Sequence, residues 1–451
     1  MMFRAVILTL ATLGAVSVGA ATTDSTKRWV GTWSTAPQLV ESANMPPSPG
    51  LNNNSLRQIV RVSIGGDTVR LKFSNDFSTS ATTLKAVTIA ASTGKGAVTA
   101  STMKTLTFGG SPSVTMNASA SVMSDPVAFA LTPRMDVAIT IYYGTTSSSV
   151  SGHPGSRTTS YLLAGDKSTA ANFSGATSTE HWYNINTIDV LAPKSAASVA
   201  ILANSIADGR GSTTDLQNRW PDIFSEALLK NTATSQVGVL NLGIGGNCVL
   251  SGGLGPTGVS RYQRDILDQR GLQWVIVSEG VNDIGGVSSA SAATTTANNL
   301  INAYKKFIAD AHAKNLKVYG ATIMPFNGNS YYNASSESCR STVNKWIRTP
   351  GNYDAVIDFD KIMRSTSDTT KLGVTTYQND GLHPDAAAYK KMGESIDLGL
   401  FVPSSSEIVG QGTSRKSPLT TNSGVTLRFD GKSMGVEYKG RRVDGRNDAS
   451  H

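Results

Sequence analysis

The chain has 451 residues, and its 40 Lys and Arg against 32 Asp and Glu give a formal net charge of +8. Hydrophobic residues at 39% and charged residues at 16% exclude a coiled coil and a disordered polypeptide, and they favour a globular protein of roughly two or three domains. Two cysteines exclude a disulfide-rich scaffold. The positive charge forms no basic stripe and accompanies no RNA-binding motif, so no nucleic-acid partner is expected.

Residues 1–21 have the layout of a signal peptide. Arg4 precedes an apolar run over 5–18, and small residues follow at 19–21. That run is short for a bilayer span and no later apolar stretch of about 20 residues exists, so no integral membrane association is expected; an uncleaved anchor is the alternative. Candidate glycosylation sequons stand at Asn53, Asn117, Asn172 and Asn333. We predict a secreted, extracellular glycoprotein.

Residues 22–190 are predicted to form an all-β accessory domain, a β-sandwich or jelly-roll. Apolar and polar residues alternate over 60–64 and again over 69–73, and Gly65-Gly66-Asp67 between them predicts a hairpin. The same pattern continues over 87–91 and 137–143. Such a domain serves packing or carbohydrate binding, and the aromatic pair Trp182 and Tyr183 would close its core or line a sugar site.

Residues 196–401 change character, because short apolar runs now alternate with helical patterns. One helix face is formed by Leu300, Tyr304, Phe307, Ile308 and Ala311. Buried strands are predicted at 199–202, 237–242, 274–277, 318–323 and 356–357. The alternation predicts a parallel sheet with helices on both faces, which binds ligands at the carboxyl ends of its strands. Residues 402–451 are predicted to be a disordered tail to which no function is assigned, and 425–429 is the one stretch in it with strand periodicity.

Polar residues at these strand ends supply the roles of a serine acyl hydrolase. Ser205 follows the first strand, where backbone N–H groups of a turn face incoming negative charge. Gly246 and Asn282 follow the next two strands and offer donors to an oxyanion. His383 and the nearby Asp380 supply a base and its orienting acid. Each residue alone has a structural reading as a cap or a turn, but together they indicate catalysis.

In this order the residues make the region from about 198 to 401 resemble the SGNH hydrolases, the superfamily of the GDSL lipases and esterases. The resemblance implies a flavodoxin-like three-layer α/β/α fold without a metal or an organic cofactor. It also implies the site roles: Ser205 as nucleophile, His383 as base oriented by Asp380, and an oxyanion hole made of Gly246, Asn282 and the Ser205 backbone N–H.

Neighbouring stretches of sequence narrow the resemblance to one subgroup of the superfamily, and one residue departs from the family pattern. The strings 207–215, 219–221 and 274–285 look like a secreted esterase subgroup, in which an N-terminal β-domain opening with a string like 29–33 is usual. The usual Gly-Asp-Ser is replaced here by Ala203-Asn204-Ser205. Since that Asp is not the triad acid, the change bears on rate and substrate range more than on reaction class.

The cysteines and the other histidines give no indication of a cysteine nucleophile, a second catalytic histidine or a metal site. Cys248 and Cys339 would either form a disulfide that braces the oxyanion loop or remain separate buried thiols, and neither has a setting that activates a nucleophile. His153, His181 and His312 are assigned surface or packing roles. His-Glu-x-x-His and paired Cys-x-x-Cys motifs are absent from the sequence, so no metal site is predicted.

We therefore predict a monomeric secreted esterase that cleaves carboxylic esters through an acyl-enzyme. Short-acyl esters, such as O-acetyl groups on a polysaccharide, are the expected substrate. A lipase or lysophospholipase and an acyltransferase with the same triad are alternatives. A non-catalytic carbohydrate-binding protein is an alternative of another class.

Overall fold

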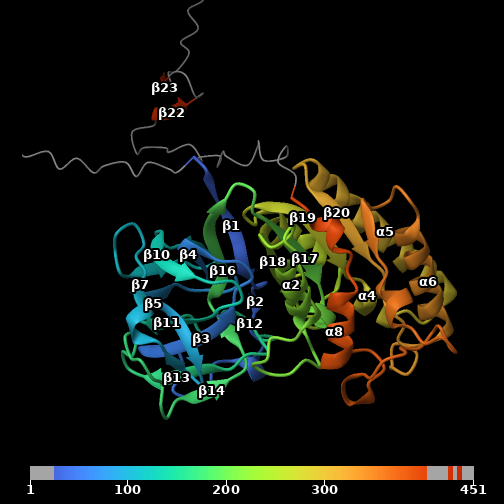
Figure 1. Ribbon diagram of the computed structural model, residues 1–451, viewed down its shortest axis with the longest axis horizontal. Coiled ribbons are helices and arrows are strands. Elements are labelled where there is room, and N and C mark those ends of the chain that lie inside the picture. The colour runs from blue at the N-terminus through green and yellow to red at the C-terminus, as the bar shows by residue number, and fades with distance from the viewer. Residues whose placement is uncertain (1–24, 404–424, 430–433, 439–451) are drawn as a thin grey trace, which may run out of the picture. The chain divides into compact units, whose positions relative to one another are not determined.

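The computed structural model describes residues 25–403, 425–429 and 434–438 (Figure 1). The chain divides into two compact units, Met1–Ser404 and Ser405–His451. In the second unit, β22 (Val425–Phe429) pairs antiparallel with β23 (Met434–Tyr438), and β22 is the strand that the sequence predicted there. The predicted signal peptide and the rest of the predicted tail beyond residue 403 lie outside the described residues.

The β region, residues 27–193, is built of antiparallel sheets (Figure 1). Most of its buried apolar side chains form one core, and Ile59, Ala90, Val98 and Ala138 form a smaller cluster. The first sheet contains β1 (Lys27–Ser34), β16 (Ile185–Pro193), β4 (Gly66–Ser74), β10 (Val127–Leu131) and β9 (Ser121–Met123). The second contains β14 (Thr177–Thr179), β13 (Ser160–Ala164), β3 (Asn54–Arg61), β11 (Asp136–Tyr143), β5 (Thr82–Gly94), β6 (Ala97–Val98), β7 (Lys104–Thr105) and β8 (Val114–Met116). A small third sheet contains β15 (Trp182–Tyr183), β12 (Ser151–His153) and β2 (Gln38–Leu39).

The predicted hairpin around residues 65–67 is wrong. Its two strands, β3 and β4, belong to different sheets: β3 pairs with β11 and β13, and β4 pairs with β16 and β10. Between them, the Thr32 hydroxyl donates to the carbonyl of Ile64 at 2.7 Å and accepts from its N–H at 2.9 Å, so the chain crosses past β1. Alternation shows which side chains face a core, and two strands on opposite sides of one core alternate as a hairpin does.

The aromatic pair of the β region serves its core. Trp182 and Tyr183 are both buried, and the ring of Trp182 meets that of Trp33 edge-on at 5.1 Å. The indole N–H of Trp182 donates to the Ile59 carbonyl at 3.1 Å, and the hydroxyl of Tyr183 donates to the Asn44 carbonyl at 2.7 Å. The packing interpretation of this pair is therefore correct.

The α/β region, residues 197–401, contains the predicted parallel sheet in the strand order 2-1-3-4-5, which is typical of doubly wound folds. Its strands are β18 (Val237–Gly243), β17 (Ala197–Ala203), β19 (Leu272–Ser278), β20 (Lys317–Ala321) and β21 (Ala355–Ile357). All seven residues of β17 are buried, as a strand inside such a sheet requires. The jelly-roll connection and the three-layer stacking stay predictions.

Helices connect these strands. They are α1 (Ser205–Asp208), α2 (Trp220–Lys230), α3 (Gly258–Arg261), a π-helical turn at Tyr262–Leu267, α4 (Val281–Gly285), α5 (Ala290–His312), α6 (Ala334–Arg348), α7 (Phe359–Met363) and α8 (Ala386–Glu394). Short 3₁₀ turns lie at Ser42–Asn44, Ala100–Thr102, Tyr377–Asn379 and Leu398–Phe401. The predicted face of α5 is buried at every position. Within the described ranges, every helix is too short or too polar for a membrane span.

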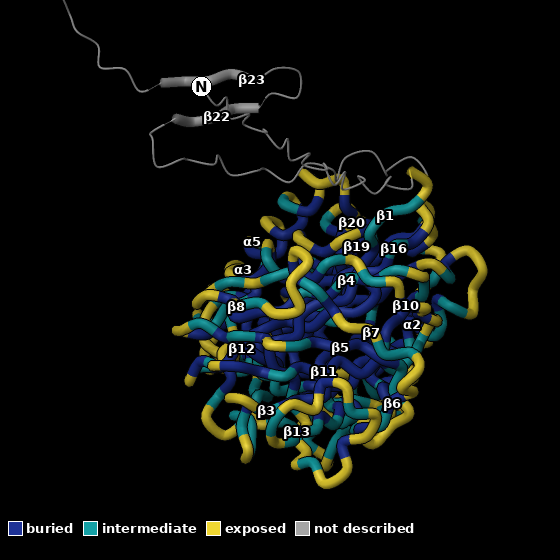
Figure 2. The backbone as a smooth tube through the Cα atoms, turned by 90° about the vertical axis from the view of Figure 1, so that its left-hand side faces the viewer, coloured by how far each residue is buried: buried dark blue, intermediate teal, exposed yellow. Residues whose placement is uncertain are grey.

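The two regions are packed against each other within one compact unit, at the edge strand β18. The Gly31 N–H in β1 donates to the Arg270 carbonyl at 2.9 Å, and the Val239 N–H in β18 donates to the Ser63 hydroxyl at 3.0 Å. A Cβ on Gly238 would lie 2.1 Å from the Gly31 carbonyl oxygen, so glycine permits this approach. Figure 2 shows exposed residues concentrated in the outer loops, with the strands buried. The β region therefore covers a sheet edge that would otherwise be open.

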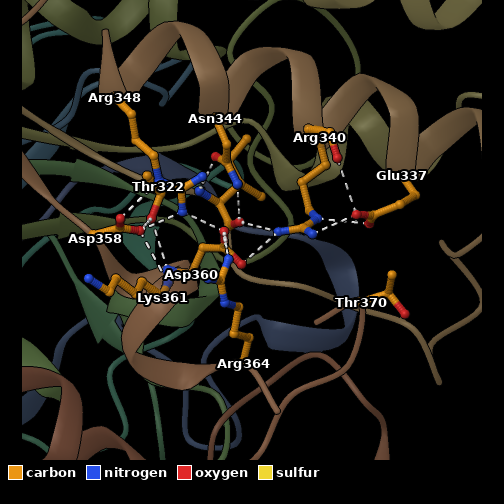
Figure 3. A network of polar contacts seen from close by, with 12 residues as sticks. Thr322, Glu337, Arg340, Asn344, Arg348, Asp358, Asp360, Lys361, Arg364 and Thr370 are labelled. Atoms are coloured by element: carbon orange, nitrogen blue, oxygen red, sulfur yellow. Dashed lines mark hydrogen bonds and ion pairs between the residues drawn. The ribbon is translucent and has the colours of Figure 1, made fainter. Parts of the chain in front are cut away.

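A charged network joins helices to the α/β sheet near the carboxyl end of β20 (Figure 3). The buried carboxylate of Asp360 pairs with Arg340 at 3.0 Å, Arg348 at 2.5 Å and Arg364 at 3.5 Å. Arg340 also donates to the carbonyl of Ile323, just beyond β20. The network joins α6, α7 and the end of β20, and so holds the carboxyl edge of the sheet in place.

Candidate active site

The nucleophile candidate occupies a tight turn between β17 and α1. The Oδ1 of Asn204 accepts from the Ile206 N–H at 3.1 Å and so caps α1, whose first residue is Ser205. Gly209 ends the helix in the left-handed region at φ 96°, and its N–H donates to the Ser205 carbonyl at 2.8 Å. The Ser205 hydroxyl is thereby fixed at the carboxyl end of a sheet strand, where the sequence analysis expected it.

The loop before α8 brings the other two predicted residues to this hydroxyl. The Nε2 of His383 lies 2.8 Å from the Ser205 Oγ, and its Nδ1 lies 2.6 Å from the Asp380 Oδ2. The Asp380 Oδ1 accepts from the backbone N–H groups of Leu382 and His383, each at 2.9 Å. Ser205, His383 and Asp380 therefore form one continuous chain of hydrogen bonds.

The surroundings set the charge of each member. Burial lowers the pKa of His383 and outweighs the opposing hydrogen bond and charge of Asp380. Burial alone would raise the pKa of Asp380, but hydrogen bonds from the His383 side chain and from two backbone N–H groups outweigh it, so that the pKa lies below its usual range. Near neutral pH the imidazole is thus neutral beside an ionised carboxylate, the state that a general base requires.

The predicted oxyanion residues lie on the two loops beside α1. Gly246 follows β18 with a φ of 67°, and Asn282 lies in α4 after β19. The Asn282 Nδ2 donates to the Asn247 carbonyl at 2.7 Å, and its Oδ1 accepts from the Tyr331 hydroxyl at 3.1 Å, which fixes the orientation of the amide. The two loops are thus joined next to Gly246. The donor role of Gly246, Asn282 and the Ser205 N–H stays a prediction.

Comparison with known proteins identifies a family for part of the chain. Residues 204–396 match the model of the GDSL-like lipase/acylhydrolase family. These residues form a GDSL-like hydrolase domain. A search of curated proteins found no match.

Several solved structures are similar to the chain. An acetyl xylan esterase is 18% identical, covers 44% of this chain and 96% of its own, and has a TM-score of 0.34. The lipase/acylhydrolase from Enterococcus faecalis is 17% identical over 46% of this chain and 98% of its own, with a TM-score of 0.35. A carbohydrate esterase family 2 enzyme with a carbohydrate-binding domain, from Corynascus thermopiles, is 14% identical over 80% of this chain and 97% of its own, with a TM-score of 0.33. These likenesses assign no substrate.

Beneath the nucleophile turn, the GDSL-like domain holds a buried carboxyl group, that of Glu279, which the sequence analysis did not single out. The Asn204 Nδ2 donates to the Glu279 Oε2 at 3.2 Å. Burial raises the pKa of Glu279 to about 8, although the positive charge of Arg261, 3.5 Å away, opposes it. Arg261 also donates to the carbonyls of Ala203 and Leu242 at 2.9 and 2.6 Å. Asn204 therefore gives Glu279 a donor where aspartate would bring a second carboxylate.

The β region also contacts the nucleophile helix of the GDSL-like domain. Asp208, the last residue of α1, accepts from the His153 Nε2 at 2.8 Å and from the Arg157 Nη2 at 3.2 Å. Gly155 lies against the same carboxylate, and a Cβ there would come within 2.0 Å of it. His153 thus has the packing role predicted for it. Arg157 gave no signal in the sequence, because it lies in a polar loop 51 residues away from Asp208.

The disulfide alternative for Cys248 and Cys339 is wrong for this structure, because both are free and buried. Burial raises the pKa of the Cys248 thiol to about 12 and that of Cys339 to about 11. Both thiols are therefore protonated near neutral pH, which agrees with the prediction that neither is a nucleophile.

The remaining predicted residues have local roles. His181 lies 2.7 Å from the carbonyl of Pro154, and His312 forms an exposed pair with Asp354 at 2.8 Å. Among the sequons, Asn53, Asn117 and Asn172 are exposed. Asn333 instead caps α6, and its Nδ2 donates to the Val287 carbonyl at 2.7 Å, so its amide nitrogen is already engaged.

Proposed function

We propose that this protein is a serine esterase that hydrolyses carboxylic esters through an acyl-enzyme on Ser205. One observation carries the proposal: the Ser205 hydroxyl, the His383 imidazole and the Asp380 carboxylate form a hydrogen-bonded chain with distances of 2.8 and 2.6 Å. The order of the groups is that of a nucleophile, a base and an orienting acid.

The reaction proceeds in two acyl transfers. The His383 Nε2 takes the Ser205 proton as the Oγ attacks the ester carbonyl carbon, and the Ser205 N–H, the Gly246 N–H and the Asn282 amide donate to the oxyanion. His383 then protonates the leaving alcohol. Water attacks the acyl-enzyme with His383 again as the base, which releases the acid and restores the Ser205 hydroxyl. Asp380 holds the imidazole tautomer and stabilises its charged form throughout.

The proposed substrates are short-acyl esters, above all O-acetyl groups on carbohydrates, and the proposed location is extracellular. The signal-peptide layout of residues 1–21 and the three exposed sequons support secretion as a glycoprotein. An accessory β region suits a polymeric substrate, and here it contacts the helix that begins at Ser205 through Asp208.

Hydrolysis of p-nitrophenyl esters from acetate to palmitate tests the proposal. We expect a preference for acetate and a loss of at least about 10,000-fold in kcat for Ser205→Ala, because the nucleophile is removed. Ser341→Ala, a serine exposed on α6, is the matched control and should keep full activity.

Three outcomes would contradict parts of the proposal. Equal rates for the wild type and Ser205→Ala would overturn the nucleophile, and a palmitate preference would indicate a lipase. Product formation that exceeds hydrolysis when an acceptor alcohol is added would indicate an acyltransferase. Glycan binding that Ser205→Ala leaves unchanged, with no ester turned over by the wild type, would indicate a carbohydrate-binding protein.

A further inference from the structure

Two arginines flank the Ser205–His383 pair, and neither is part of the triad. Arg210 directly follows the nucleophile helix, and its backbone N–H donates to the Ser205 carbonyl at 3.0 Å. Its guanidinium lies over the ring of Tyr377, 5.3 Å from the centroid. The Tyr377 N–H in turn donates to the His383 carbonyl at 2.7 Å. Arg210 thus spans from the nucleophile turn to the loop that carries the base.

The guanidinium of Arg210 is held over the ring of Tyr377 but has no anionic partner among the described residues. Arg210 is exposed, and in the part of the chain that the structure describes its guanidinium has neither a carboxylate at ion-pair distance nor a hydrogen-bond acceptor. Arg340 and Arg348, by contrast, are each paired with two carboxylates. A guanidinium that rests on an aromatic ring with its donors unused is suited to bind a carboxylate in two-point fashion.

The second cation comes from the β region. Arg157 is held by one hydrogen bond to Asp208, and its buried Nε–H has no partner among the described residues. The positive charges of Arg210 and Arg157 both contribute to the lowered pKa of His383, after burial as the main cause. Both charges therefore act on the imidazole.

The position of Arg210 determines which half of an ester it meets. His383 must deliver a proton to the leaving alcohol, so the alcohol lies on the His383 side of the site. Arg210 borders that side through Tyr377, whereas Gly246 and Asn282 lie on the loops after β18 and β19. Resting on the proposed esterase function, we propose that this site selects esters whose alcohol part carries a carboxylate, as in an O-acetylated uronic-acid polysaccharide.

A matched pair of small esters tests the charge preference. The probes are 3-acetoxybenzoate and its neutral methyl ester, which share the acyl group and differ in the charge of the alcohol part. We expect kcat/KM of the wild type to favour the charged probe by about 10-fold, and Arg210→Gln to remove most of that preference, chiefly by raising KM. Arg210→Lys should retain part of it. Arg270→Gln, an exposed arginine before β19 at the opposite sheet edge, is the control and should keep the full preference.

Acetate release from O-acetylated polygalacturonate and O-acetylated xylan gives the second measurement. We expect the uronate polymer to be preferred, with a preference that falls as salt is raised and disappears in Arg210→Gln. Equal kcat/KM for charged and neutral substrates, or an unchanged preference in Arg210→Gln, would overturn the charge selection while leaving the esterase intact. Hydrolysis that persists in Ser205→Ala, or no hydrolysis of any of the four substrates, would overturn the esterase and this inference with it.

Discussion

Each region of this molecule contributes a histidine paired with an aspartate, and the two pairs differ in the group that faces the second ring nitrogen. His383 in the α/β region has Asp380 on Nδ1 at 2.6 Å and the Ser205 hydroxyl on Nε2 at 2.8 Å. His153 in the β region has Asp208 on Nε2 at 2.8 Å and the Ala36 carbonyl on Nδ1 at 2.9 Å. A hydroxyl can donate, whereas a carbonyl and a carboxylate can only accept.

The comparison separates the proposed base, His383, from a structural histidine, His153. The imidazole of His383 keeps a lone pair directed at a donor, so it can take a proton from Ser205. The imidazole of His153 lies between two acceptors, so neither of its ring nitrogens faces a hydroxyl from which it could take a proton. It can only hold Asp208 at the end of the nucleophile helix. A His–Asp pair therefore indicates catalysis only when a proton donor faces the second nitrogen.

The largest expected effect is that of Asp380→Asn, which breaks the proposed catalytic pair. We expect kcat to fall by about 1,000- to 10,000-fold, because the amide no longer orients and charges the imidazole correctly. For the wild type, kcat/KM should rise with pH and level off below pH 6.5, since the base must be neutral and its pKa is lowered from 6.5. Asp380 raises that pKa, so the residual activity of the variant should reach its plateau at lower pH still.

This prediction is checked by measuring kcat/KM as a function of pH for the wild type, Asp380→Asn and Asp354→Asn. Asp354 forms the exposed pair with His312, so its variant changes a His–Asp pair away from the triad and should keep full activity. A wild-type acidic limb above pH 6.5, or activity retained by Asp380→Asn, would contradict the assigned base and acid.

A smaller effect is expected from His153→Ala, which breaks the structural pair. The buried carboxylate of Asp208 would keep only Arg157, so we expect a loss of about 3 kcal/mol in the free energy of unfolding. Because Asp208 ends the helix that begins at Ser205, kcat/KM should also fall, by about 10-fold, without a shift of the pH profile. Urea unfolding and p-nitrophenyl acetate hydrolysis measure both quantities. If stability and activity were unchanged, the β region would not support the site.

The smallest effect concerns Glu279, the buried carboxylate next to Asn204. Its pKa is raised from 4.5 to about 8, so its contribution to stability is fully present below about pH 4.5 and is lost as pH rises through 8. Compared with Glu279→Gln, the wild type should therefore lose at least about 1 kcal/mol of stability between pH 5 and pH 9. Asn204→Asp, which adds a second carboxylate, should lose more over the same range. Parallel stability curves for all three proteins would show that Glu279 is ionised in the fold at both pH values.

Much of the fold and of the triad could be read from the chain, because those signals are local. All five strands of the parallel sheet and the buried face of α5 follow from apolar periodicity, which reports the burial of each element by itself. Asp380 and His383 are three residues apart in one loop, and each of the other candidates directly follows a strand. Since parallel strands end at one sheet edge, the sequence alone brought these residues together.

Pairing between distant elements required the tertiary structure. Alternation over 60–73 suggested a hairpin, although β3 and β4 belong to different sheets, because a periodic strand does not specify its partner. Asn204 meets Glu279 across 75 residues, and His153 meets Asp208 across 55. Residue types and local periods predicted the proposed catalytic residues and their place at the edge of the sheet. The folded chain alone decided which buried charges support the nucleophile, because such contacts depend on how elements approach in space.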